Sequence, residues 1–204
     1  MTTVVRTTVA DAIAKVCLLV LPLSACTSGA RPAPSPNPGA QHVAGSRFLT
    51  THAFYGVPIL QRSFFWDGNG EVDDSGIGVH AGQCLDDHVA VGAGSNVATW
   101  WAPGSDIYSL EIEALVRVHP DRDWPVFLDG TGGYQLANDD IPPGGTVWNF
   151  TFSFGGGLEF PIGKATSLLT GLQYHHISNA LGRENERNPS QNEARLWVGV
   201  EWNF

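Results

Sequence analysis

A short segment near the C-terminal end of the chain, YHHISNA (174–180), combines a histidine with a serine two residues later. Residues two apart in a strand lie on the same face, so His176 and Ser178 are neighbours on one surface. A serine hydroxyl becomes a nucleophile when a base removes its proton, and histidine is the usual base near neutral pH. Asn179 follows and offers a side-chain amide to an oxyanion. The spacing admits a serine hydrolase site, but His-x-Ser is a common triplet, and ordinary polar residues near a strand end are the simpler interpretation from the spacing alone.

A hydrolase of this kind also needs a group that orients the histidine, and the next strand, from 192 to 204, provides two candidates. By alternation with the apolar residues of that strand, Asn192 shares the face of His176. Glu193 lies on the other face unless a bulge shifts the register. We expect Asn192 to orient the histidine, and Glu193 is the alternative. An amide stabilises an imidazolium less well than a carboxylate, so weakened or lost activity is part of this expectation.

The motif belongs to a chain made of short strand-like segments that end at turn signals. The chain contains 24 glycines and only 15% charged residues, which together with its aromatic side chains favours β structure. A bulge or a helical turn competes with a strand only in the segment 108–118. We predict eight strands, at about 47–55, 75–84, 87–101, 107–119, 124–136, 146–160, 165–178 and 192–204.

The N-terminal region predicts export. Arg6 and Lys15 precede an apolar run that is too short to cross a bilayer as a helix but has the length of a signal-peptide core. The LSAC sequence that ends at Cys26 resembles the bacterial lipobox, in which the cysteine is lipidated. We therefore expect a signal peptide over 1–25 and a lipid anchor on Cys26, with an ordinary cleaved signal as the alternative.

The chain after the signal divides into two parts. Residues 26–46 are rich in Pro, Ala, Ser and Gly, which predicts a flexible tether before a barrel domain over 47–204. Beyond the predicted lipidation site only Cys84 remains, so no internal disulfide can form. That thiol could join two chains, which leaves a homodimer open, but a small packed side chain is the simpler interpretation.

The last strand, EARLWVGVEWNF, has the clearest pattern, because apolar residues alternate with small, polar or mixed ones. Such a strand fits a barrel with lipid outside and a polar interior. Soluble sandwiches and lipocalin-like barrels alternate too, but the export signal and the terminal Phe204 resemble those of bacterial outer-membrane barrels. We therefore expect an all-β, eight-stranded antiparallel up-and-down β-barrel of outer-membrane type. A barrel of this size has a lumen filled by side chains, which argues against transport.

The composition excludes several partners. A net charge of −9 argues against nucleic acid, which needs clustered lysine and arginine. The histidines are scattered over different strands without ligand spacing, so we expect neither a metal site nor another cofactor.

The HISNA sequence (176–180), the NP step at 188–189 and the strand that follows resemble the PagL family of outer-membrane lipid A 3-O-deacylases. The similarity extends over roughly 107–204. It implies an esterase on the outer barrel wall in the bacterial outer membrane, among outer-membrane lipids. Its substrate would be lipid A of lipopolysaccharide, and no cofactor or metal would be needed.

The resemblance also implies roles for single residues. His176 would be the general base, Ser178 the nucleophile, Asn179 a support for the oxyanion, and Asn188 would shape the loop near the site. The chain departs from the family pattern at the acidic position, which is Asn192 here. A non-catalytic outer-membrane barrel lipoprotein with a degenerate site is therefore the alternative function.

Overall fold

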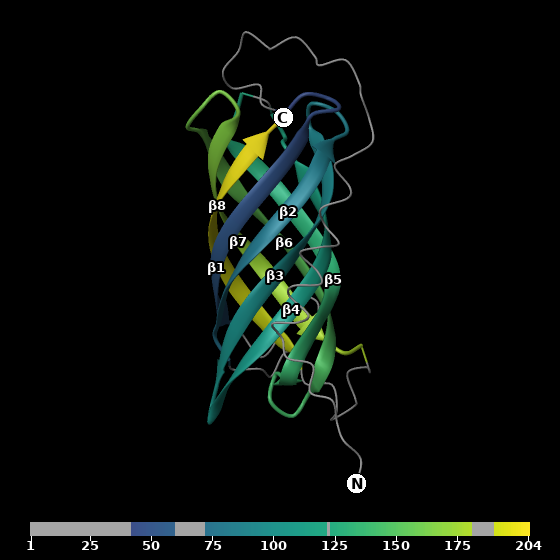
Figure 1. Cartoon of the computed structure of the whole chain (residues 1–204), viewed down its shortest axis with the longest axis vertical. Helices are drawn as coiled ribbons and strands as arrows, with labels where there is room; N and C mark the ends of the chain where they lie inside the picture. The colour runs from purple at the N-terminus through teal and green to yellow at the C-terminus, as the bar shows by residue number, and fades with distance from the viewer. Residues whose placement is uncertain (1–41, 60–71, 122, 181–189) are drawn as a thin grey trace. The chain divides into compact units, whose positions relative to one another are not determined.

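The wall of the barrel is one closed antiparallel sheet (Figure 1). The computed structural model describes residues 42–59, 72–121, 123–180 and 190–204. Each strand pairs with its sequence neighbours, and the last strand closes on the first. The strands are β1 (Arg47–Pro58), β2 (Asp74–Cys84), β3 (Val89–Ala102), β4 (Ser105–Val118), β5 (Val126–Ile141), β6 (Thr146–Pro161), β7 (Thr166–Ser178) and β8 (Gln191–Asn203). Among the described residues, no helix is long and apolar enough to cross a membrane.

The predicted eight-stranded antiparallel barrel is confirmed, and the strand bounds agree to within three residues except at the end of β5. There the strand continues beyond a register shift between Leu136 and Ile141. The segment 108–118 contains neither a bulge nor a helical turn, because β4 pairs without interruption with β3 and β5. In the sequence, Leu115 interrupts the alternation of outward apolar and inward polar residues in this segment. It points inward and packs with three other buried residues, Phe48, Cys84 and Ala90.

Strand alternation separates an apolar outer face from a mixed inner face. In β8, Leu196 and Val198 are 61% and 51% exposed, whereas Trp197 and Glu201 are 6% and 0% exposed. This confirms the pattern predicted for the last strand. It also provides the reference for deciding which way the neighbouring side chains point.

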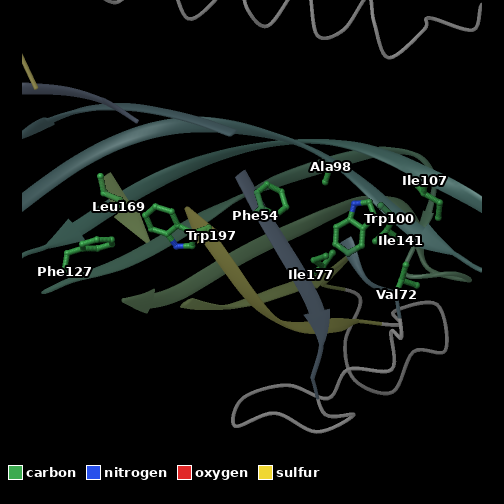
Figure 2. Packing of buried hydrophobic residues seen from close by; sticks show 10 residues of the cluster. All are labelled: Phe54, Val72, Ala98, Trp100, Ile107, Phe127, Ile141, Leu169, Ile177 and Trp197. Atoms are coloured by element: carbon green, nitrogen blue, oxygen red, sulfur yellow. The ribbon is translucent and has the colours of Figure 1, made fainter. Parts of the chain in front are cut away.

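The lumen is filled by side chains rather than by an open channel. Figure 2 shows the rings of Phe54, Trp100 and Trp197 within the cluster of buried apolar residues. Charged groups fill the remaining space in hydrogen-bonded pairs, of which Arg117 with Asp129 is one example. A cavity of about 20 Å³ remains, which is room for roughly one water molecule.

The two ends of the barrel differ in their connections. The end at which β1 begins and β8 ends, called the terminal end below, lies near the C label in Figure 1. The opposite end, called the loop end, carries the two longest connections in the barrel. The terminal end has the turns 85–88, 119–125 and 162–165, and the loop end has the connections 59–73, 103–104, 142–145 and 179–190.

The segment 42–46 was predicted as the last part of the tether, but it is bound to the terminal end of the barrel. The Gly45 N–H donates to the carbonyl oxygen of Cys84 at 2.8 Å, and the Cys84 N–H donates to the carbonyl oxygen of Ser46 at 2.9 Å. Cys84 itself is 1% exposed and has the packed environment that the sequence favoured.

Candidate active site

The motif segment lies at the loop end of the barrel, where β7 finishes at Ser178. In the register, His176 stands between Phe152 of β6 and Asn192 of β8. Ile177 is fully buried in the lumen, so its neighbours in β7 point outward. The predicted orientation of His176, Ser178 and Asn192 toward the outer wall agrees with this register.

A short hydrogen bond joins His176 to Asn192 across the two strands. The distance from His176 Nδ1 to Asn192 Oδ1 is 2.7 Å. An amide oxygen only accepts hydrogen bonds, so Nδ1 carries the proton and the neutral ring has its lone pair on Nε2. This tautomer is the one that a general base requires. Asn192 therefore occupies the position of an orienting group.

Tyr174 also contacts Asn192, and it was not singled out from the sequence. Its hydroxyl donates to Asn192 Oδ1 at 2.5 Å. Tyr174 lies two residues before His176, so strand alternation places it on the same face and could have identified it. The ring of Phe152, 4.9 Å from that of His176, covers another side of the imidazole. His176 is 2% exposed, so its position is tightly defined.

Ser178 ends the strand at a point where the backbone turns. Residues two apart in an extended strand have Cα atoms about 6.7 Å apart, so Ser178 shares a face with His176, but no hydrogen bond joins these two side chains in the described part of the chain. Asn179 follows and is buried. Ala180 then has a φ of 60°, a left-handed conformation that few residues other than glycine adopt. Strained backbone of this kind is concentrated at functional sites.

Glu193 does not belong to this group. The pairing of β7 with β8 runs from Thr166–Trp202 to Ile177–Gln191 without a shift, so no bulge turns Glu193 outward. Its carboxylate is fully buried in the lumen, 3.0 Å from His175 Nδ1. The choice of Glu193 as a catalytic candidate is therefore corrected, because the wall of the barrel separates it from His176.

Two further predicted residues, Cys26 and Asn188, lie outside the described residues. Lipidation and the role of the NP step therefore stay predictions.

The outer wall around the motif is apolar. Large hydrophobic side chains from three neighbouring strands are exposed there, which gives a surface suited to lipid or to an acyl chain. Their exposed fractions are 51% for Phe150, 44% for Phe154, 58% for Leu172 and 61% for Leu196.

Neither a family model nor a curated protein matches the sequence. Solved structures do match. The crystal structure of Neisserial surface protein A (NspA) is 16% identical over 78% of this chain and 99% of that chain, with a TM-score of 0.57. The outer membrane enzyme PagL is 16% identical over 74% of this chain and 97% of that chain, with a TM-score of 0.53.

The chain has the fold of an eight-stranded outer-membrane β-barrel. This fold supports an outer-membrane location. At such low identity the similarity concerns the fold alone, and the two proteins differ in kind, since one is described as a surface protein and the other as an enzyme.

Proposed function

We propose that this barrel is an outer-membrane serine esterase that hydrolyses the 3-position acyl ester of lipid A. The observation that carries the proposal is the hydrogen bond from His176 to Asn192 on the outer wall, with Ser178 on the same face of β7. The similarity of the HISNA and NP sequences to the PagL family supports the choice of substrate. The predicted lipid anchor on Cys26 would add a second attachment to the same membrane.

The reaction would begin at Ser178. Its hydroxyl attacks the ester carbonyl while His176 Nε2 accepts the proton. Asn192 holds the Nδ1–H of the imidazolium that forms, and the side-chain amide of Asn179 donates to the developing oxyanion. The tetrahedral intermediate then expels the sugar hydroxyl, which takes the proton from His176.

A water molecule completes the cycle. His176 removes a proton from the water, which attacks the acyl-serine; the 3-hydroxy fatty acid is released as the Ser178 Oγ–acyl bond breaks, and His176 returns the proton to Ser178 Oγ. The exposed side chains of Phe150, Leu172 and Leu196 form an apolar surface for the acyl chain while the ester is held at Ser178.

The decisive test is a mass spectrum of lipid A from a lipid A-producing host that expresses either the wild type or Ser178→Ala. The proposal predicts loss of one 3-hydroxyacyl mass with the wild type only. A matched control is Ser75→Ala, which changes an outward serine at the start of β2, at the same end of the barrel. This control should behave as the wild type.

Unchanged lipid A with all three proteins, each shown to be folded in the outer membrane, would contradict deacylation. It would favour the alternative function, a non-catalytic barrel with a degenerate site. Asn192, which stands at the acidic position of the family pattern, would then mark the loss of activity.

A further inference from the structure

A second cluster of chemically capable side chains lies at the terminal end, at the opposite end of the barrel from the candidate active site. It consists of His42 from the segment before β1, His119 directly after β4, and Glu159 near the end of β6. One ligand atom from each residue can be chosen so that all three atoms lie within 4.8 Å of one another. The cluster therefore has the size of a metal site.

The two histidines converge on the same carboxylate oxygen. His42 Nε2 lies 2.7 Å from Glu159 Oε2, and His119 Nε2 lies 3.4 Å from that atom. The two imidazole rings are stacked with their centres 4.1 Å apart. Two nitrogen atoms and one oxygen atom thus face a common point from three separate elements.

His119 Nε2 is a buried polar atom with no hydrogen-bond partner in the part of the chain that the structure describes. The contact with Glu159 at 3.4 Å lacks the alignment of a hydrogen bond. Buried polar groups in folded proteins are nearly always satisfied, and an orphan often marks a bound ion or water. An ion between the three side chains would satisfy this nitrogen.

Supporting contacts hold two of the three side chains from behind. The Ser167 hydroxyl donates to Glu159 Oε1 at 2.6 Å and leaves Oε2 to face the histidines. Cys84 Sγ lies 3.6 Å from His42 Nδ1, the ring nitrogen that does not face Glu159. Metal-binding side chains are typically fixed by such contacts on their other polar atom. In this arrangement the thiol supports His42 and is not itself a ligand.

The surroundings carry an excess of negative charge. Glu201 Oε1 lies 4.0 Å from His42 Nε2, and Glu201 also shares Arg117 with Asp129. Asp129 and Glu201 thus share the one guanidinium of Arg117, whereas Glu159 contacts the two histidines. Such a balance favours a dication at the centre of the cluster.

We propose that His42, His119 and Glu159 bind one divalent transition-metal ion with the ligand preference of Zn²⁺. Imidazole nitrogen and carboxylate oxygen are zinc ligands, and two nitrogen atoms on one tetrahedral zinc are separated by about 3.3 Å. The observed cluster needs only small side-chain movements to reach that spacing. The ion would attach the segment 42–46 to the turn after β4 and to β6, and so fix the point where the predicted tether enters the barrel.

Spacing along the chain indicated no metal site, because the three ligands are far apart in sequence. The alternative is that no metal ion binds and His42 carries a proton. His42 and Glu159 would then form a simple ion pair with the same geometry.

The test uses the full-length folded barrel, purified in detergent without a histidine tag, and titrated with Co²⁺ as a spectroscopic probe and with Zn²⁺ by calorimetry. We expect one ion per chain, visible absorption typical of four- or five-coordinate Co²⁺, and a Zn²⁺-dependent rise in the unfolding temperature. His42→Ala and His119→Ala should each lower the affinity at least tenfold. His42 precedes the first strand, so its removal should leave the barrel folded.

The matched control is His88→Asn, which changes an exposed histidine in the neighbouring turn 85–88 and keeps a donor near the carbonyl oxygen of His119. This variant should bind metal as the wild type does. Absence of stoichiometric binding to the wild type would overturn the proposal and leave the ion pair. Binding that persists in both His42→Ala and His119→Ala would equally overturn it, because the ion would then lie elsewhere.

Discussion

His175 and His176 are consecutive residues with opposite surroundings. His175 points into the lumen, where its Nδ1 lies 3.0 Å from Glu193 and its Nε2 lies 3.5 Å from Glu111. His176 points outward, and its Nδ1 is bonded to the amide of Asn192. Their partners in β8 are consecutive as well, so the pleat of two paired strands sends the carboxylate to one histidine and the amide to the other.

The two pairs differ in how their polar groups are satisfied. Inside, Arg195 lies close to Asp74 and Glu193, so the carboxylates there take part in a compensated network. Outside, the amide of Asn192 accepts a hydrogen bond from the neutral imidazole of His176, and such a pair requires no counter-charge. The inner pair is thus suited to hold the fold, and the outer pair to orient a base. Substitutions of single residues in the two pairs can therefore separate the stability of the barrel from the proposed activity.

The largest effect is expected for the outer histidine. His176→Gln keeps the size and polarity of the side chain but removes the base, so deacylation should fall by about 10³-fold. The free energy of unfolding should change by less than about 2 kcal/mol. Both quantities can be measured on the barrel folded into lipid vesicles, by product release and by denaturant titration.

The control for this variant is the same change one residue earlier. His175→Gln should destabilise the barrel and leave the turnover of the folded fraction unchanged. If His175→Gln removed turnover and His176→Gln did not, the assignment of the two faces would be wrong.

The inner carboxylate should matter for stability rather than for chemistry. Glu193→Gln leaves His175 and Arg195 without one buried counter-charge, so we expect a loss of about 3 kcal/mol in the free energy of unfolding. Turnover per folded molecule should stay near the wild-type value. A loss of turnover comparable to that of Ser178→Ala, with stability unchanged, would restore Glu193 as the acidic member of the site.

The smallest of the three effects concerns the outer amide. Asn192→Asp places a carboxylate beside His176, where it stabilises the imidazolium formed during attack, so turnover should rise by roughly tenfold or more. Tyr174 offers its hydroxyl to the same oxygen, which helps to keep the new charge satisfied. Asn192→Leu, which cannot accept the Nδ1–H, is the matched loss-of-function variant. Equal rates for Asp, Asn and Leu would show that position 192 does not orient the base.

The sequence predicted the strands and their inward and outward faces better than it predicted the contacts between side chains of different strands. Alternation in the last strand was enough to orient Asn192 outward and Glu193 inward, because strand parity is a local property. Leu115 blurred the pattern of β4 because an inward apolar residue looks the same as an outward one when the partners that cover it are unknown. The contact between Tyr174 and Asn192 follows from register, which the sequence alone only approximates.

The cluster at the terminal end could not be predicted in this way. His42, His119 and Glu159 come from three elements, and only closure of the barrel brings them together. Their distances depend on the shear of the whole sheet and on the path of the segment before β1. No periodicity within one strand contains that information.

The uninterrupted register between β7 and β8 has a consequence for how this protein can change over evolution. The loop that joins the two strands could gain or lose residues while His176 still stands opposite Asn192. A single insertion inside either strand would reverse the parity of every residue beyond it, unless a bulge absorbed the extra residue. A buried histidine would then face lipid and the outer one would enter the lumen. We therefore expect homologues to vary in length between the strands and to keep the strands themselves free of insertions and deletions.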